Sequence, residues 1–422
     1  MSWEKAKIGD HCEVTSSKRI FYSEYVDQGI PFYRSKEIIE KSQGQPISEP
    51  LFIPKEKYNE IKNKFGVPAP EDMLLTSVGT IGIPYIVKPE DEFYFKDGNL
   101  TWFRSFDDTL SPKFLYYWIN SEEGKGILNN STIGSSQKAL TISSLKGIEC
   151  PLPPIDVQFR IVSILSSFDA LIENNQKQIK LLEEAAQRMY KEWFVDLRFP
   201  GYEDTPVVDG VPEGWKLIPL SEFIAYEIGG GWGEEVPDGK CEIEAYVIRG
   251  TDLYGITHGE ILNIPFRYHI ESNFTARKLQ DGDIVFEVSG GSKSEGVARC
   301  LLITSEMLDY WEKPVICASF CKLIRPKSLY SQYLHDCFKY MRASGATEEY
   351  DKRSASSIVN FRWKDFLTQE PLLLPSLEVI QKYNIIAMSL YRKIVMCSLQ
   401  IESLKTARDR LLPKLMSGEM EV

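Results

Sequence analysis

The sequence predicts a mixed α/β (α+β) protein of two similar globular domains, each followed by a long helix. Three observations support this fold class. Short motifs recur in the same order in both halves, strand-like and helix-like runs alternate within each half, and each half ends in a long amphipathic stretch. The repeat of roughly 200 residues is far longer than the ~20–50 residues of a solenoid unit. A chain of 422 residues therefore holds two domains with separate cores, which suggests two similar binding events.

The duplication is visible as pairs of matching segments. These pairs are Trp3-Glu-Lys-Ala-Lys-Ile-Gly-Asp10 with Trp215-Lys-Leu-Ile-Pro-Leu-Ser-Glu222, Asp72–Gly82 with Asp283–Lys293, and Pro151–Ile155 with Leu373–Leu377. Because the order of the pairs is the same in both halves, the two domains are expected to share one topology.

Short apolar runs between Gly, Pro, Asn and Asp predict strands in the first half. They are Ile30–Arg34, Met73–Ser77, Ile81–Val87 and Asn99–Phe103. A helix is predicted from Pro112, with Ser111 as its N-cap, because proline suits the first helical position. The second half repeats this helix near Tyr330–Phe338.

A seven-residue apolar period predicts a long helix from Ile155 to about Trp193 and a second one about 222 residues later. On the first helix the two heptad positions hold Ile161, Leu165, Phe168, Ile172, Asn175, Ile179, Leu182, Ala186, Met189 and Trp193. On the second they hold Ala387, Leu390, Ile394, Cys397, Ile401, Leu404, Arg408 and Leu411. An ordinary core-packing helix is the alternative, but a sustained period of 3.5 favours an antiparallel coiled coil.

Two further features refine this helical pair, and two loops lie outside it. Asn175 and Cys397 occupy equivalent positions, and Asn175 either fixes the register or is simply tolerated. Pro413 and Gly418 are predicted to end the second helix. Residues 198–214 are rich in Pro, Gly and Asp and form the linker, and Gly229–Gly233 is interpreted as a flexible loop.

The predicted domain order is a globule at 1–150, a helix at 151–197, a linker and second globule at 198–375, and a second helix and tail at 376–422. If the second helix packs back along the first, the globules lie at opposite ends of a rod with a pseudo-two-fold axis at its middle. Such an arrangement suits two half-sites on a DNA duplex.

Composition and missing motifs exclude several functions. The net charge of −11 argues against a uniformly basic nucleic-acid coat, so any DNA contact must use local basic clusters. The chain lacks a phosphate-binding loop, the Asn/Asp-Pro-Pro-aromatic motif of amino-methyltransferases and a defensible nuclease cluster.

Eight scattered Cys and four His argue against a zinc site and for thiols in a reducing cytoplasm. No apolar run is long enough to span a bilayer, and the start does not resemble a signal peptide.

Taken in order, these motifs resemble the specificity subunit of type I restriction–modification enzymes. The resemblance rests on Trp3–Asp10, Ile30–Arg34, Ser77–Gly82, Gly134–Lys138 leading to Pro151–Pro154, the heptad helices and Leu411–Glu419. Each motif is weak alone, but the duplicated order is specific. Two departures are Asp156–Gln158, where the family often has Glu-Gln, and Gly290–Lys293, which replaces the Gly-Thr-Ile-Gly segment in the second half.

The resemblance implies a non-catalytic subunit whose two target recognition domains each bind one half of a bipartite DNA sequence. It implies that the helices separate the domains and dock two methyltransferase subunits, and that restriction/translocase subunits join through the complex. S-adenosylmethionine and ATP are then expected on partner chains, with no cofactor and no metal on this one. A two-headed coiled-coil adaptor that binds proteins or glycans is the alternative, which the bulk acidity favours.

Candidate DNA-binding residues are polar or basic side chains in predicted loops, because base edges and phosphates are bound by such groups. In the first half they are Lys18, Arg19, Arg34, Ser35, Lys36, Thr76, Ser77, Thr80, Ser135, Ser136, Gln137 and Lys138. In the second half they are Arg249, Thr251, Ser289, Ser292, Lys293, Lys352, Arg353, Ser354 and Ser357.

Overall fold

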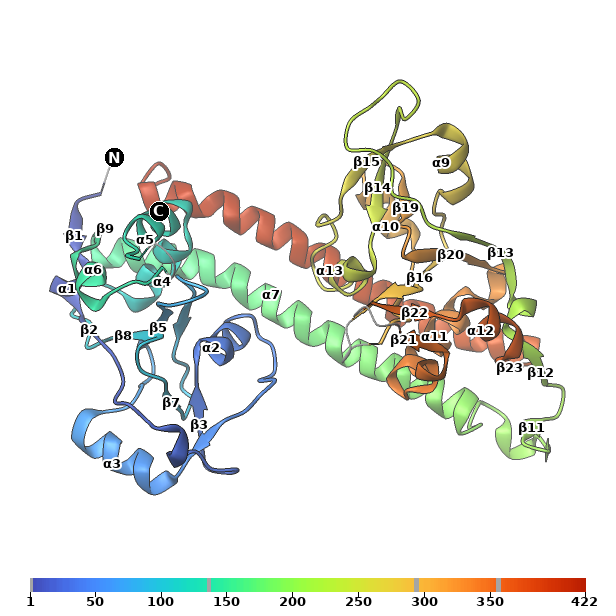
Figure 1. Ribbon diagram of the computed structural model, residues 1–422, viewed down its shortest axis with the longest axis horizontal. Helices are drawn as coiled ribbons and strands as arrows, with labels where there is room; N and C mark the ends of the chain where they lie inside the picture. Colours follow the sequence, from blue (N-terminus) through green and yellow to red (C-terminus); the bar gives the residue numbers. More distant parts are fainter. Residues whose placement is uncertain (1–2, 135–137, 292–295, 354–357) are drawn as a thin grey trace. The chain divides into compact units, whose positions relative to one another are not determined.

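The computed structural model describes residues 3–134, 138–291, 296–353 and 358–422 (Figure 1). The chain forms two compact units. Unit 1 comprises Met1–Glu173 and Lys405–Val422, and unit 2 comprises Asn174–Leu404. Both boundaries fall inside the long helices α7 (Ile155–Tyr190) and α13 (Leu377–Ser417), so each helix contributes one end to each unit. The predicted class, two β-rich domains joined by two long helices that pack together, is confirmed.

The described residues of unit 1 form three small sheets. The largest has the order β2 (Glu13–Thr15), β8 (Leu100–Arg104), β5 (Met73–Thr76) and β6 (Pro84–Ile86), with every pair antiparallel. A second has β3 (Ile30–Tyr33) between antiparallel β4 (Phe52–Ile53) and parallel β7 (Tyr94–Phe95). The third pairs β1 (Lys5–Lys7) with β9 (Glu149–Pro151).

Unit 2 repeats this topology. Its largest sheet has the order β13 (Ile224–Gly229), β20 (Cys321–Pro326), β16 (Ile284–Glu287) and β18 (Cys300–Leu302). In the second sheet, β14 (Ile243–Ile248) lies between antiparallel β15 (Phe266–His269) and parallel β19 (Val315–Cys317). The third pairs β12 (Lys216–Pro219) with β23 (Pro371–Leu374). The duplicated sequence motifs therefore encode a duplicated strand order.

Unit 2 also has an additional sheet formed by β17 (Ser289–Gly290), β22 (Val359–Phe361) and β21 (Asp351–Arg353). Unit 1 has an isolated bridge between Val78 and Ala139 at the matching place.

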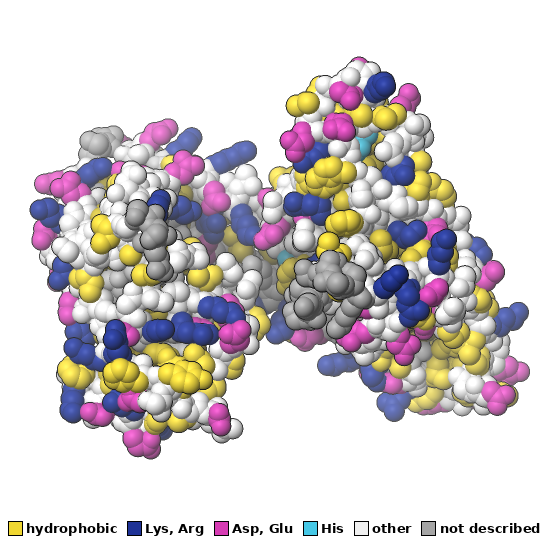
Figure 2. All heavy atoms as spheres, viewed as in Figure 1, with side chains coloured by type: hydrophobic (Ala, Val, Ile, Leu, Met, Phe, Trp, Pro, Cys, Tyr) yellow, Lys and Arg dark blue, Asp and Glu magenta, His cyan; other side chains and the backbone are white. Residues whose placement is uncertain are grey.

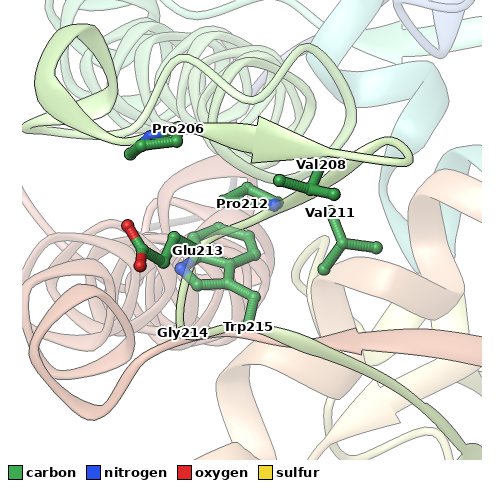
Figure 3. A pocket seen from close by; sticks show the side chains of 7 residues that line it. All are labelled: Pro206, Val208, Val211, Pro212, Glu213, Gly214 and Trp215. Carbon is green, nitrogen blue, oxygen red and sulfur yellow. The ribbon is translucent and has the colours of Figure 1, made fainter.

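The linker at residues 198–214 contains the small hairpin of β10 (Val207–Val208) and β11 (Val211–Pro212), next to Trp215. The hairpin and Trp215 line an open, mostly apolar hollow of about 400 Å³. Figure 3 shows the side chains that line it.

The shorter helices cover the sheets. Unit 1 has α1 (Ile8–His11), α2 (Ser35–Ser42), α3 (Lys55–Phe65), α4 (Pro112–Asn120), α5 (Glu122–Asn130) and α6 (Ile142–Gly147). Unit 2 has α8 (Leu253–Ile256), α9 (Glu271–Arg277), α10 (Ser305–Tyr310), α11 (Ser331–Ala343) and α12 (Trp363–Gln369). As predicted, α4 begins at Pro112, and the N-cap Ser111 hydroxyl accepts the backbone N–H of Phe114.

The long helices run antiparallel within each unit. In unit 1, Ile161 and Leu165 of α7 share a core with Leu412 and Leu415 near the end of α13. In unit 2, Gln178 approaches Cys397, whereas the ring of Trp193, beyond α7, lies 5.6 Å from that of Tyr383. Later positions on α7 therefore meet earlier positions on α13.

Burial follows one of the two predicted heptad positions more closely than the other. Buried members are Ile161, Leu165, Ile172, Asn175, Ile179, Ala186, Trp193, Ala387, Ile394, Cys397 and Ile401. Half-buried members are Phe168, Leu182, Met189, Leu390, Leu404, Arg408 and Leu411. Side chains outside the heptad positions, such as Tyr190 and Tyr383, are buried as well. Each helix thus packs both on its partner helix and on a globular core.

The prediction that Pro413 ends the second helix is wrong. The helix continues through this exposed proline to Ser417, and Gly418 follows with a φ of 73°. A proline in a helix removes one backbone hydrogen bond. Burial of Leu412, Leu415 and Met416 in the core of unit 1 offsets that loss, because these side chains need the helix to continue.

No helix in the described part of the chain is long and apolar enough to cross a membrane. Among the same residues, no group of three or more His, Cys, Asp or Glu is placed to hold a metal ion. All eight cysteines are free, and burial raises the pKa of the Cys150 and Cys300 thiols to about 12.

Candidate nucleic-acid interface

Three loops chosen from the sequence meet at one turn of unit 1, just before β8. The carbonyl of Asn99 accepts the backbone N–H of Ser77 at 2.8 Å and the hydroxyl of Ser35 at 3.4 Å. The N–H of Leu140 donates to the carbonyl of Ser77 at 2.9 Å, which brings in the segment that contains Lys138. The loops around 34–36, 76–80 and 138 therefore form one surface, called the unit 1 face below.

A fixed ion pair lies at the edge of this face. The guanidinium of Arg34 donates to Glu37 at 2.5 Å, and the backbone N–H of Arg34 donates to the same carboxylate at 2.6 Å. Glu37 is fully buried, and its hydrogen bond raises the pKa of Arg34. Lys36 pairs with exposed Glu49 at 2.9 Å. Much of the positive charge predicted here is thus neutralised within the loop.

Two of the candidate DNA-binding residues in unit 1 have side chains that are used inside the fold. Thr76 and Ser77 are buried, and their hydroxyls bond the N–H of Ile83 at 2.9 Å and the hydroxyl of Thr101 at 2.7 Å. These bonds close the loop instead of presenting a polar group to a ligand. Thr80 is exposed on the same loop, so it remains available for contact.

Lys18 and Arg19 border the same turn. The Lys18 ammonium lies 4.6 Å from the ring centre of Phe65, and Arg19 donates to Asp97 at 2.8 Å. Asp97 precedes Asn99 by two residues. Both cations are exposed, so they extend the unit 1 face on the side of the loop that follows β2.

The unit 2 face is built in the same way before β20. The carbonyl of Phe320 accepts the backbone N–H groups of Val288 at 2.9 Å and Ser289 at 3.1 Å. A Cβ on Gly250 would lie 2.5 Å from Glu287, so the Arg249–Thr251 loop adjoins this turn. Pairing of β17 with β22 and of β22 with β21 adds Lys352.

Each face contains an equivalent ion pair between an arginine and a carboxylate. At a second position, only the unit 2 face has an ion pair. Arg249 donates to Asp252 at 2.7 Å, with its N–H on the same carboxylate at 2.8 Å, as Arg34 does with Glu37. In contrast, buried Glu287, paired with Arg299 at 2.6 Å, stands where unit 1 has Thr76. The backbone arrangement of these loops, called the frame below, is therefore duplicated, whereas the side chains on it are not.

Several candidates lie outside the described residues, namely Ser135, Ser136, Gln137, Ser292, Lys293, Ser354 and Ser357. Of Arg353 only the backbone is described, in β21. The exposed candidates that the structure does describe are Lys18, Arg19, Thr80, Lys138, Thr251 and Lys352. Lys36 is exposed as well, whereas Arg34, Ser35, Arg249 and Ser289 are half-buried.

Sequence reasoning missed the aromatic side chains on these faces. Trp232 is 41% exposed, with the Arg267 guanidinium 4.9 Å from its ring, a pair comparable with Lys18 and Phe65. The loop Gly229–Gly233, which carries Trp232, is held in place and not flexible as predicted. The N–H of Gly230 donates to the carbonyl of Cys321, and a Cβ on Gly230 would lie 2.1 Å from a backbone oxygen of Ala318. Lys18 and Trp232 both follow the edge strand of the largest sheet, β2 or β13, so a comparison of the two halves places them together.

Figure 2 shows that Lys and Arg side chains lie in small groups among acidic ones on the face in view. This distribution agrees with a net charge of −11 and with contact through local clusters.

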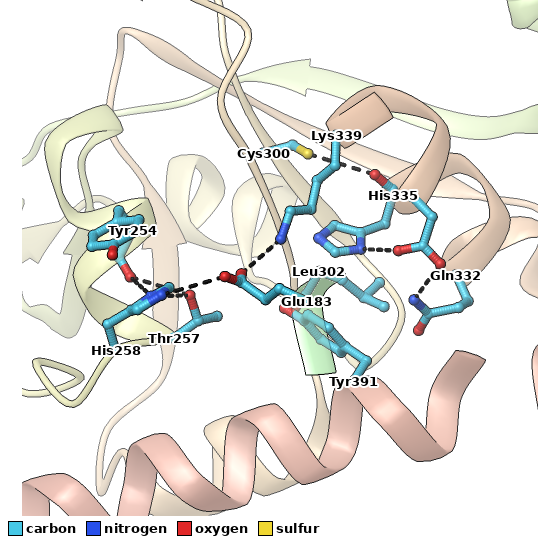
Figure 4. A network of polar contacts seen from close by, with 11 residues as sticks. Glu183, Tyr254, Thr257, His258, Cys300, Leu302, Gln332, His335, Lys339 and Tyr391 are labelled. Atoms are coloured by element: carbon cyan, nitrogen blue, oxygen red, sulfur yellow. Dashed lines mark hydrogen bonds and ion pairs between the residues drawn. The ribbon is translucent and has the colours of Figure 1, made fainter. Parts of the chain in front are cut away.

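A polar network fastens α7 to unit 2 (Figure 4). Glu183 of α7 accepts a hydrogen bond from Lys339 of α11 at 2.8 Å and lies 3.5 Å from His258. Burial alone would raise the pKa of Glu183, but the hydrogen bond from His258 and the charge of Lys339 lower it to about 2. In unit 1, Asp169 of α7 accepts from Tyr117 at 2.6 Å and Arg408 at 2.7 Å. In each unit, a carboxylate of α7 therefore bonds side chains from other segments of the same unit.

Two similar units on a pair of long helices, with ordered loops at matched places, define a recognition protein. Residues 1–184 match the family model described as the type I restriction modification DNA specificity domain. The chain is 27% identical over 369 residues to the type I restriction enzyme MjaIX specificity subunit of Methanocaldococcus jannaschii, covering 83% of this chain and 78% of that one. It is 30% identical over 186 residues to a putative type I restriction enzyme specificity subunit of Haemophilus influenzae, covering 44% and 45%.

The fold also matches the crystal structure of a type I restriction–modification S subunit from M. genitalium. The TM-score is 0.60 at 15% identity, and the match covers 98% of this chain and 96% of that one. By its similarity to the family model and to the M. jannaschii relative, the chain is the non-catalytic DNA specificity subunit of a type I restriction–modification system.

Proposed function

We propose that each unit binds one half of a bipartite DNA target through the face described above. The recognition domains correspond to residues 1–150 and 198–375, and the spacer helices to 151–197 and 376–422. The observation that carries this proposal is the duplicated frame, in which Asn99 and Phe320 each accept backbone N–H groups from the matching loop. Different side chains in one frame fit two different half-sites.

The long helices are the proposed docking surface for two methyltransferase subunits. Apolar side chains stand exposed on them, with Leu171 51%, Leu181 64%, Ile385 75% and Met396 42% exposed. These apolar groups are available for a partner subunit to cover. The partners supply S-adenosylmethionine and ATP binding, the restriction subunits join through the complex, and the assembly acts in the cytoplasm.

Reconstitution with the cognate methyltransferase tests the whole proposal. Sequencing of methylated sites should show one interrupted motif, and native mass measurement should show two methyltransferases per chain. An assembly that selects no DNA motif would favour the protein- or glycan-binding adaptor instead.

Single-lysine variants test the faces themselves. Lys138→Ala and Lys352→Ala should each weaken DNA binding and lower the salt slope of binding by about one. Lys364→Ala, an exposed lysine of α12, is the matched control and should leave the slope unchanged. Equal slopes for all three variants would contradict the placement of the faces.

Insertion of one heptad into each long helix, near Asn175 and Cys397, tests whether the helices set the spacing. A heptad adds about 10 Å of helix, or about three base pairs of unread spacer. Methylated-site sequencing should show longer spacing with unchanged half-sites. Persisting modification at the original spacing would contradict a spacing role for the helices.

A further inference from the structure

One position at the centre of each face differs in chemistry between the units. The turn from β7 to β8 in unit 1 ends in Asn99, and the turn from β19 to β20 in unit 2 ends in Phe320. Both residues directly precede the first residue of a central strand of the largest sheet. They therefore occupy the same place in the duplicated frame.

The backbone at this position is fixed, and the side chain is not used internally. The carbonyl oxygens of Asn99 and Phe320 accept N–H groups from the neighbouring loop, which holds each turn against the face. Phe320 is nevertheless 56% exposed. The amide of Asn99 is half-buried and forms no hydrogen bond with the described residues. Neither side chain contributes to its unit's core, so the requirements of folding do not explain why these residue types stand at positions 99 and 320.

The neighbouring groups suit a DNA base edge. In unit 1, exposed Arg19 and Thr80 lie on the loops beside Asn99. In unit 2, exposed Thr251 and half-buried Ser289 lie on the loops beside Phe320. Polar side chains that can bond phosphates or bases thus lie on the loops next to the Asn99 amide and the Phe320 ring.

We propose that this matched position determines base specificity in both half-sites, an inference that rests on the proposed DNA-binding function. The Asn99 amide donates to and accepts from the N7 and N6 edge of an adenine in the major groove. Phe320 makes an apolar contact with the C5 methyl group of a thymine, the one apolar group on a major-groove base edge. The two half-sites differ at this position because the frame is the same and the side chain is not.

Base-analogue scanning with the full chain and its methyltransferase tests this inference. Each thymine of the target is replaced in turn by deoxyuridine, which lacks the methyl group, and each adenine by 7-deazaadenine, which lacks N7. Competition binding should show one deoxyuridine position in the unit 2 half-site with about fourfold weaker binding, the effect of one buried methyl group. One 7-deazaadenine position in the unit 1 half-site should weaken binding about tenfold.

Variants assign these effects to residues. Phe320→Ala should abolish the deoxyuridine effect at that position, whereas Phe320→Leu, which stays apolar, should retain it. Asn99→Ala should abolish the 7-deazaadenine effect and leave the unit 2 profile unchanged. Tyr202→Ala removes an exposed aromatic ring of the linker, 43% exposed and on neither face, and should leave the deoxyuridine profile unchanged.

The outcomes separate this inference from the proposed function. If the wild-type complex selects an interrupted motif but Phe320→Ala keeps every deoxyuridine effect, Phe320 does not contact a methyl group and the inference fails alone. A motif with no position sensitive to either analogue also overturns it. If the wild-type complex selects no motif, the proposed function itself fails.

Discussion

Replacing Glu183 by Gln should destabilise unit 2 by about 3 kcal/mol. Its carboxylate is 26% exposed and faces Lys339 and His258. The folded pKa of about 2 lies below the ordinary value of 4.5, and each pKa unit corresponds to about 1.4 kcal/mol. The amide keeps the shape of the side chain but removes the charge, which leaves Lys339 without its partner.

The sign of the pH dependence follows from the lowered pKa. A carboxylate with a depressed folded pKa stabilises the fold fully above the unfolded value of 4.5, and this contribution falls as pH drops from 4.5 towards 2. The wild type should lose about 1 kcal/mol of this contribution by pH 4. Glu183→Gln has no such group, so the stability difference between the two proteins should narrow over the same range.

Urea unfolding followed by circular dichroism measures this difference at pH 7 and at pH 4. Glu184→Gln is the matched control, because its exposed side chain lies next to Glu183 on α7. It should stay within about 0.5 kcal/mol of the wild type. Equal midpoints for the two variants, or a difference that does not change with pH, would refute the reasoning.

Five further variants, two of them controls, probe packing and hydrogen bonding by urea unfolding. Ile179→Asp should cost more than about 3 kcal/mol, because Ile179 is fully buried, whereas Leu181→Asp at a 64% exposed site should stay within about 0.5 kcal/mol. Tyr117→Phe should cost about 1 kcal/mol, since it removes one hydrogen bond to a carboxylate. Gly230→Ala should destabilise unit 2 through its backbone clash, whereas Gly229→Ala, with open space around it, should cost little. Equal effects within either pair, or an unchanged midpoint for Tyr117→Phe, would contradict these assignments.

The elements that the sequence predicts well are those with a local physical cause. Ser111 and Pro112 start α4 because a hydroxyl can accept an orphan N–H and proline needs no donor there. The heptad period likewise predicts the long helices, since one face of each must be buried. Neither prediction needs knowledge of distant residues.

Where prediction fails, a distant contact changes the outcome. Pro413 is a helix breaker by local rules, but the core of unit 1 buries Leu412 and Leu415 on either side of it. Thr76 and Ser77 look like surface groups in a polar loop, but Ile83 and Thr101 use their hydroxyls. No local pattern carries that information.

The same limit explains why charged loop residues alone could not define the DNA-binding faces. Arg34 is a plausible phosphate ligand from its residue type, but buried Glu37 three positions later already neutralises it. Asn99 and Phe320 have no basic character and stand out only when the two units are compared in one frame. A duplicated chain provides that comparison itself. Positions that keep the same backbone contacts but change their side chain have been released from a structural role, and those positions are where two half-sites would be distinguished.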